Sequence, residues 1–201
     1  MRNTYFHAES SAAQNDSFVV PEYDDKKALV ESLNATGGNA ADQVRAFPPR
    51  GLGQATVKTA IAANADAAVL NGDAAAGNQI NGQAVAANDF LLLELDARHP
   101  QRGNWQLMLI AAVNGAAANG EIDITNLTAF DAEQVPRAAS AVNKRAYIIF
   151  AEDVRTLLIG NTTVLDIRRS IVGFAGHPLA LVIDGNAAAL HRITGTIAYV
   201  D

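Results

Sequence analysis

The stretch QINGQAVAANDFLLL, residues 79–93, decides the fold class of this chain. Its dipeptide Asn81-Gly82 favours a tight hairpin turn, because both residue types adopt positive φ at low cost. Val85 follows the hairpin and is expected to fill a small core. A second turn is predicted at Asn88-Asp89, after which residues 90–95 form an apolar run of strand length. The stretch therefore predicts antiparallel β structure.

The segments on both sides continue this pattern. Residues 96–103 are polar and contain Pro100, which predicts a loop, and the apolar run from Trp105 to Ala112 can return antiparallel to residues 90–95. Alternating small and branched residues predict another strand at 55–61. Further strands are expected at 122–125, 147–151, 156–159, 179–183 and 191–200. Asn-Gly and Asp-Gly pairs between these runs supply turns, so we predict a sandwich or barrel-like antiparallel β domain over residues 54–201.

The first 53 residues are predicted to form an arm, a short helix and a linker. Residues 1–23 lack sustained periodicity and are expected to be an extended arm that docks on a neighbouring molecule, although residues 18–20 can pair as an edge strand. The apolar and aromatic residues that would anchor this arm are Tyr5, Phe6, Phe18, Val19, Val20 and Tyr23. Acidic residues before 26–33 and glycines after it favour a short helix. Residues 37–53 are rich in Gly and Pro and form the expected linker.

The secondary structure of two stretches is ambiguous between helix and strand. Residues 131–142 contain helix-forming residues around Pro136. Residues 163–174 place Val164, Ile167 and Ile171 at helical spacing, and Thr163 could begin a helix.

Composition excludes several classes of function. The chain has 201 residues, a formal net charge of −6 and no cysteine. An acidic chain offers no broad cationic surface for nucleic acid, and a chain without cysteine has neither disulfides nor thiolate metal chemistry. Polar residues interrupt every apolar run, so no membrane span is predicted. The first residues lack the apolar stretch of a signal peptide, and we expect no export.

No pattern typical of an enzyme or a metal site occurs in the sequence. The four histidines are not at metal-ligand spacing. Glu94 and Asp96 would share one face of a strand, but a solvated face with Arg98 nearby is the more ordinary interpretation. Nucleotide-binding loops and nucleophile elbows are missing. We therefore expect no catalytic residues, no metal and no cofactor.

Residues 61–107 resemble a small β module that recurs in tailed-bacteriophage virion proteins, especially fibre and head-surface proteins. Asn81-Gly82 matches the first turn of that module, Asn88-Asp89 the second, and Gly103 with Trp105 the closing turn and aromatic residue. The core position between the turns is Val85. Four positions depart from the pattern: Asn81 replaces Asp, Asn88 replaces Gly, Arg102 replaces Asn, and Asn104 replaces an aliphatic residue.

The resemblance implies a structural role and transfers no active-site residues. We expect a bacteriophage virion protein that decorates or cements the capsid, assembled in the host cytoplasm. Its partners would be copies of itself, as a homotrimer, and other virion proteins such as the major capsid protein. One alternative is a tail, baseplate or head-fibre subunit. Another is a carbohydrate-binding attachment module in which Trp105, Tyr147 or Tyr199 stacks on a sugar, although Trp105 is more simply a core aromatic residue.

Overall fold

The computed structural model divides the chain into two compact units. One is the continuous segment Pro49–Asp153, and the other combines Met1–Pro48 with Val154–Asp201. The residues described are 2–10, 16–20, 27–36, 43–48, 53–99, 103–129, 136–158, 164–166, 177–184 and 191–200. They are mainly β, without an α-helix among them, so the predicted fold class is confirmed. No described helix is long and apolar enough to cross a membrane.

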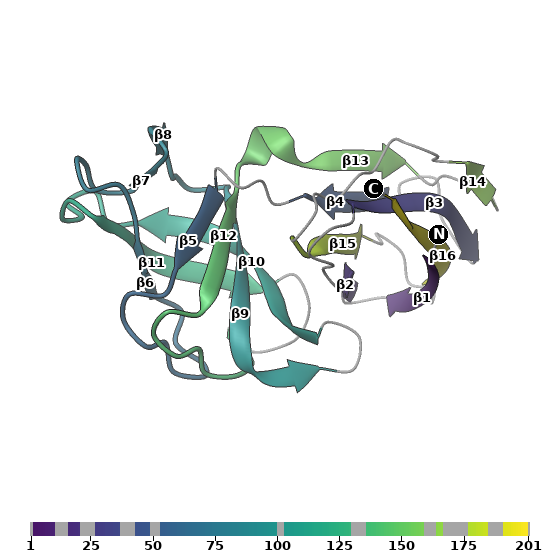
Figure 1. Cartoon of the computed structure of the whole chain (residues 1–201), viewed down its shortest axis with the longest axis horizontal. Helices are drawn as coiled ribbons and strands as arrows, with labels where there is room; N and C mark the ends of the chain where they lie inside the picture. The colour runs from purple at the N-terminus through teal and green to yellow at the C-terminus, as the bar shows by residue number, and fades with distance from the viewer. Residues whose placement is uncertain are drawn as a thin grey trace. The chain divides into compact units, whose positions relative to one another are not determined.

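The continuous segment forms a nearly closed, barrel-like sheet, which we call the barrel (Figure 1). Its strands are β5 (Gln54–Thr56), β6 (Ala68–Asn71), β9 (Phe90–His99), β10 (Gly103–Val113), β11 (Glu121–Ala129) and β12 (Arg145–Ile149). They follow the spatial order β5-β12-β9-β10-β11-β6, and every pair is antiparallel. Val57, just beyond β5, bridges to Leu70 of β6 and brings the first and last strands together. Register shifts in β10 between Ile110 and Val113 help the sheet to curve.

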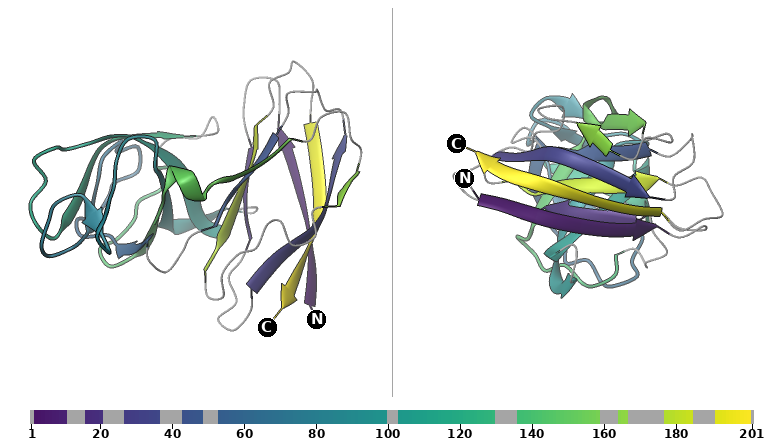
Figure 2. Two further views of the ribbon diagram at one scale, coloured as in Figure 1. Left: turned by 90° about the horizontal axis from the view of Figure 1, so that it is seen from above. Right: turned by 90° about the vertical axis from the view of Figure 1, so that its right-hand side faces the viewer.

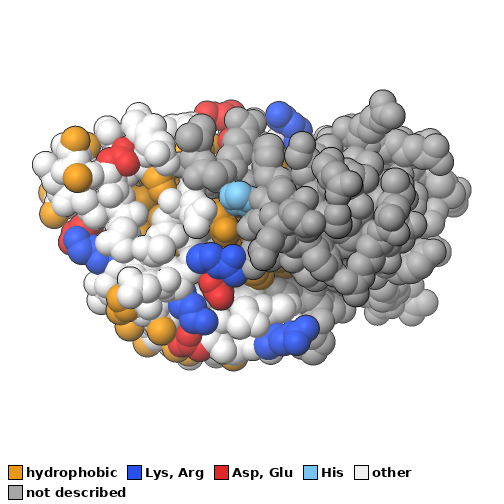
Figure 3. Space-filling view, viewed as in Figure 1, with side chains coloured by type: hydrophobic (Ala, Val, Ile, Leu, Met, Phe, Trp, Pro, Cys, Tyr) orange, Lys and Arg blue, Asp and Glu red, His pale blue; other side chains and the backbone are white. Residues whose placement is uncertain are grey.

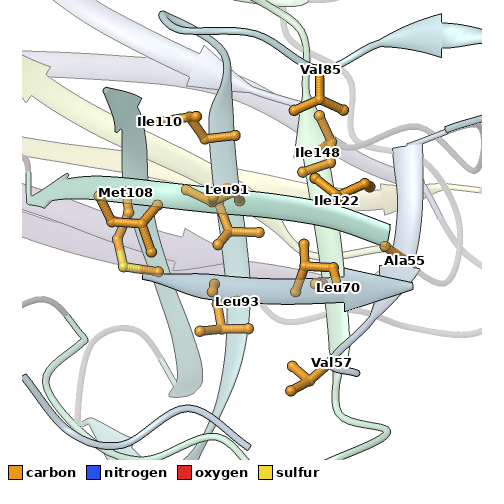
Figure 4. Close-up of a cluster of buried hydrophobic side chains, with 14 of the residues drawn as sticks. Ala55, Val57, Leu70, Val85, Leu91, Leu93, Met108, Ile110, Ile122 and Ile148 are labelled. Carbon is orange, nitrogen blue, oxygen red and sulfur yellow. The ribbon is translucent and has the colours of Figure 1, made fainter. Parts of the chain in front are cut away.

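Alternate side chains of the strands fill the barrel interior. Leu91, Leu93 and Leu95 of β9 all point to this core and are fully buried, as expected for every second residue of a strand. Val85 closes one end of the cluster and is 3% exposed. Figure 4 shows Leu91, Leu93 and Val85 in one cluster with Met108, Ile110, Ile122 and Ile148 from β10, β11 and β12. Among the described residues this core contains one aromatic residue, Phe150, and otherwise aliphatic residues and Met108, in agreement with the low aromatic content of the chain.

The discontinuous unit, which we call the sandwich, contains two four-stranded antiparallel sheets. Its strands are β1 (Arg2–Ser10), β2 (Asp16–Val20), β3 (Lys27–Thr36), β4 (Gln43–Phe47), β13 (Arg155–Leu158), β14 (Val164–Asp166), β15 (Leu179–Asp184) and β16 (His191–Val200). One sheet has the order β1-β16-β3-β14 and the other β13-β4-β15-β2. Figure 2 shows β1, β16 and β3 side by side, and β1 lies against β2 and β15 of the second sheet.

The structure corrects the predictions for the first 53 residues. The predicted helix is wrong, because residues 27–36 form strand β3 and pair with β16 along their whole length. An isolated helix this short is marginal in water, so a strand with long-range partners prevails. In place of a separate arm, β1 and β2 pair with β16 and β15 of the same chain. The predicted linker contains β4, and the division between units falls at Pro48-Pro49.

The strand predicted at 55–61 is confirmed only in part, because β5 ends at Thr56 and Val57 and Ile61 make isolated bridges. The other predicted strands are confirmed with small shifts of their ends. Those predicted at 90–95, 105–112, 122–125 and 147–151 correspond to β9 to β12, and those at 156–159, 179–183 and 191–200 to β13, β15 and β16. The polar loop after β9 is shorter than expected, because β9 continues to His99. In place of one β domain over 54–201, residues from Val154 onward complete the sandwich. Of the two open stretches, residues 164–166 are strand β14, residues 136–142 are not helical, and the remainder lies outside the described residues.

Candidate functional site

The predicted Asn81-Gly82 turn joins two short strands, β7 (Gln79–Ile80) and β8 (Gln83–Ala84). Asn81 and Gly82 have φ of 50° and 78°, as a two-residue hairpin of this type requires. The carboxylate of Asp73 accepts hydrogen bonds from both turn amides, at 2.8 Å from Asn81 N and 2.7 Å from Gly82 N. A carboxylate that receives two backbone amides fixes the turn strongly. Sequence reasoning missed this role of Asp73, because nothing in its position predicts the contact.

Asp89 is buried where the second turn enters β9, with 7% of its surface exposed. One carboxylate oxygen accepts a hydrogen bond from Ala86 N at 2.9 Å, and the other accepts one from Ala151 N at 3.0 Å. Its own backbone oxygen accepts a bond from Ile110 N at 2.8 Å. Asp89 therefore ties the turn before β9 to β10 and to η2 (Ala151–Asp153), a short 3-10 helix.

The environment of Asp89 opposes its charge. Burial raises the pKa of Asp89 above its ordinary value, and the nearby charge of Glu152 acts in the same direction. The hydrogen bonds from Ala86 and Ala151 counteract this effect only in part. Glu152 in turn accepts a hydrogen bond from Gln83 Nε2 at 2.8 Å. Since both oxygens of Asp89 already receive backbone amides, this carboxylate holds structure in place.

Trp105 closes the module as a buried residue. Only 6% of it is exposed, and its ring centroid lies 5.6 Å from that of Tyr147, which is 1% exposed. The guanidinium of Arg145 lies over the indole, 5.0 Å from the ring centroid. Trp105 therefore presents no open ring face on which a sugar could stack, and the same holds for Tyr147. The side chain of Tyr199 is outside the described part.

Arg137 fixes the backbone at the start of β10. Its Nη1 donates to the carbonyl oxygen of Trp105 at 2.9 Å, and its Nη2 donates to that of Gly103 at 3.1 Å. Its backbone amide donates to Oε1 of the buried Gln106 at 2.7 Å. Gly103 has φ of +57°, a conformation that glycine adopts without strain. No pattern in the sequence predicts this role of Arg137, which follows Pro136 in the ambiguous stretch 131–142.

Glu94 and Asp96 lie in an ion-pair network. Glu94 Oε2 accepts hydrogen bonds from the side chain and backbone of Arg145 at 3.0 and 3.2 Å, and Lys144 Nζ lies 3.7 Å from both acidic side chains. Burial alone would raise the pKa of Glu94, but these hydrogen bonds and the charges of Arg145 and Lys144 together lower it below its ordinary value. The predicted solvated face with Arg98 nearby is corrected in two respects: the cations are Lys144 and Arg145, and the Glu94 side chain is only 17% exposed.

The residues expected to anchor an arm occupy positions in the sandwich. Tyr5 and Phe6 of β1 lie opposite Thr196 and Gly195 of β16. The three residues predicted on β2 are paired with β15, and Val19 is 3% exposed. Tyr23 lies outside the described residues. Strands β1 and β2 are the outer strands of their sheets, so the anchoring role of these residues stays a prediction.

On the face in view in Figure 3, the described residues carry no large field of one sign. Figure 3 shows positive and negative side chains beside one another and hydrophobic ones in small separate patches. Lys58 and Glu121 form such a pair at 2.8 Å. Within the described residues no group of three or more His, Asp or Glu side chains could hold a metal ion.

Comparisons with known proteins do not identify a family. No protein-family model and no curated protein matches the sequence. Three solved structures are similar at a low level. VP17, a capsid protein of bacteriophage P23-77, has 10% identity and a TM-score of 0.17, with coverage of 100% of this chain and 97% of that one. The complex of the two major capsid proteins of the same phage, VP16 and VP17, has 8% identity and a TM-score of 0.17 over the whole of both chains.

The third structure is that of infectious bursal disease virus, Gx strain. It has 10% identity and a TM-score of 0.13, with coverage of 99% of this chain and 40% of that one. TM-scores this low carry no argument about fold or function.

Proposed function

We propose that this chain is a structural protein of a bacteriophage virion and works through protein–protein contacts. The observation that carries the proposal is the segment from Asn81 to Trp105, whose residues resemble a module of phage fibre and head-surface proteins. In the barrel this segment forms a tight hairpin, a second turn, a strand and an antiparallel return strand. The resemblance to the phage module depends on this order of turns and strands.

The side chains around the module support a structural role. Three acidic side chains of and beside the module are engaged: Asp73 and Asp89 receive backbone amides, and Glu94 receives Arg145. A general acid or base must instead reach a substrate proton. We therefore propose that the chain has no catalytic activity.

The more specific proposal is a decoration or cement protein that binds the major capsid protein on the virion, after assembly in the host cytoplasm. Such a protein would associate through symmetric contacts of at least ~1,000 Å². We propose a homotrimer as the unit. The main alternative is a tail, baseplate or head-fibre subunit. A sugar-binding attachment module is less favoured, because Trp105 and Tyr147 are buried.

Immunogold electron microscopy tests the proposal directly. Antibodies raised against the purified chain would be applied to particles from a culture that carries the gene, with antibody pre-absorbed on the pure protein as the control. Gold on the heads is the expected result, whereas gold on tails or fibres favours the alternative. Protein found only in the soluble fraction, with unlabelled particles, contradicts a virion role.

Light scattering coupled to size-exclusion chromatography tests the proposed oligomer separately. A homotrimer gives three times the 21.1 kDa mass of one chain. A monomer at every concentration would contradict the trimer and leave the microscopy to decide the virion role.

A further inference from the structure

The chain contains four Asn-Gly dipeptides, and all of them lie in the barrel. They are Asn71-Gly72, Asn81-Gly82, Asn114-Gly115 and Asn119-Gly120. In such a pair the glycine nitrogen can attack Cγ of the asparagine side chain. A C–N bond forms as the glycine nitrogen loses its proton, and the Cγ–Nδ2 bond breaks. The departing NH₂ group gains a proton and leaves as ammonia, and a cyclic succinimide remains. Water then opens the ring to aspartate or isoaspartate. Glycine obstructs this attack least, because it has no Cβ and an unrestricted backbone.

Three of the four glycine nitrogens are held by hydrogen bonds. Gly72 N donates to the carbonyl oxygen of Gly120 at 3.1 Å, and Gly120 N donates to that of Asp73 at 2.8 Å. Gly82 N donates to the carboxylate of Asp73 at 2.7 Å. A nitrogen that donates its hydrogen in this way must lose the bond before it can attack, and a bond to a carboxylate is the strongest of these. The fold therefore protects Asn71, Asn81 and Asn119.

Gly115 differs from the other three glycines. Its amide nitrogen makes no hydrogen bond within the described part of the chain. The residue is exposed, and a Cβ built on it would meet no atom within 4 Å. Among the described residues, the Gly115 nitrogen therefore has no hydrogen bond of its own to lose before it attacks, unlike the nitrogens of the other three glycines.

The side chain of Asn114 forms a turn with the backbone that follows it. Its Oδ1 accepts a hydrogen bond from Ala116 N at 3.1 Å, which encloses the Gly115 nitrogen in a side-chain turn and polarises Cγ. The leaving nitrogen, Nδ2, donates to the carboxylate of Asp123 at 2.8 Å. The backbone of Asn114 is fixed on both sides, because its amide donates to the Asp123 carbonyl oxygen and its own carbonyl oxygen accepts Asn78 Nδ2.

We propose that Asn114 is a site of spontaneous modification in the folded protein, converting to aspartate or isoaspartate, while the other three sites are protected. The product replaces an amide donor with a carboxylate beside Asp123. Two carboxylates at this distance repel each other, so the turn after β10 loosens. This modification does not depend on the proposed virion role.

Mass spectrometry of the aged, full-length protein tests the proposal. The purified chain is incubated at mildly alkaline pH in ¹⁸O-labelled water, and label uptake is measured at each asparagine. We expect Asn114 to react about tenfold faster than Asn81 or more, because the Gly82 amide must first leave a carboxylate. The same chain in concentrated urea is the control, in which all four sites should react at similar rates. Equal rates at Asn114, Asn81 and Asn119 in the folded chain would overturn the proposal.

Two variants test separately the hydrogen bond that holds a glycine amide and the glycine residue itself. Asp73→Ala frees Gly82 N but keeps the backbone acceptor of Gly120 N, so modification should rise at Asn81 and stay unchanged at Asn119. Gly115→Ala should slow the reaction at Asn114, and the open space around Gly115 means that this variant folds. An unchanged rate at Asn114 in Gly115→Ala would show that the glycine amide does not control the site.

Discussion

The barrel and the sandwich of this chain are built from the same kind of strand but are connected in opposite ways. In the barrel, β9, β10 and β11 are consecutive in the sequence and pair as neighbours. In the sandwich, Arg2 of β1 lies opposite Tyr199 of β16, so the paired segments come from the two halves of the unit. Pairing between distant segments costs more loop entropy and forms later than pairing between near ones. We therefore expect the barrel to fold on its own and the sandwich to require both of its segments.

Removing residues 154–201 would separate the two units most sharply. Strands β1 to β4 lose β13 to β16, which supply all their main-chain pairing partners among the described strands, whereas the barrel loses none of its own. We expect barrel amides to stay protected in hydrogen–deuterium exchange and the amides of residues 1–48 to exchange as in an unfolded chain. The control is the full chain under the same conditions. Protection of residues 1–48 in the shortened chain would show that the sandwich does not need both of its segments.

A cavity in the barrel core should act on the barrel alone. Leu91→Ala removes a fully buried side chain, and we expect a loss of about 3 kcal/mol in the free energy of unfolding of this unit. Val142→Ala is the control, because Val142 is 49% exposed and its truncation should cost about 0.5 kcal/mol or less. Exchange rates of individual amides in both variants measure the effect. An equal loss in sandwich amides would mean that the two units unfold together.

Asp89 tests how far one side chain holds the barrel turns. Asp89→Ala removes the acceptor of two backbone amides, and we expect a loss of about 2 kcal/mol, measured by urea unfolding. Asp66→Ala is the matched control, because Asp66 is exposed. If both variants lose the same stability, the amides of Ala86 and Ala151 do not need this carboxylate.

The ion pair of Glu94 should give the smallest effect, visible as a pH dependence. Because the pKa of Glu94 is lowered in the folded state, its contribution is present above the unfolded pKa and is lost as the pH falls through the folded value. Glu94→Gln should therefore lose less stability than the parent on acidification, with a difference of about 1 kcal/mol or less. The free energy of unfolding of both proteins, measured at neutral and acidic pH, gives this difference. The same pH dependence in both proteins would contradict a stabilising contact between Glu94 and Arg145.

The difference between local and distant strand pairing also determines what could be predicted from the sequence. Strand positions in the barrel follow from period-two runs between Asn-Gly turns, which are local signals. The helix predicted at residues 26–33 failed because its apparent start and stop signals are weaker than the pairing of β3 with β16, a partner more than 150 positions away in the chain. The contacts of Asp73 and Arg137 could not be predicted either, because each depends on segments that the fold alone brings together.

The pairing of β1 with β16 has a consequence during synthesis on the ribosome. The barrel lies between β4 and β13 in the sequence. It is therefore complete before β13 to β16, the pairing partners of β1 to β4, have been translated. During that interval β1 and β3 expose main-chain edges that β16 later fills. On a polysome, the finished β16 of a leading chain is available to pair with such edges before the nascent chain has its own β16. Exchange of this strand between chains is thus the misassembly that this connectivity favours.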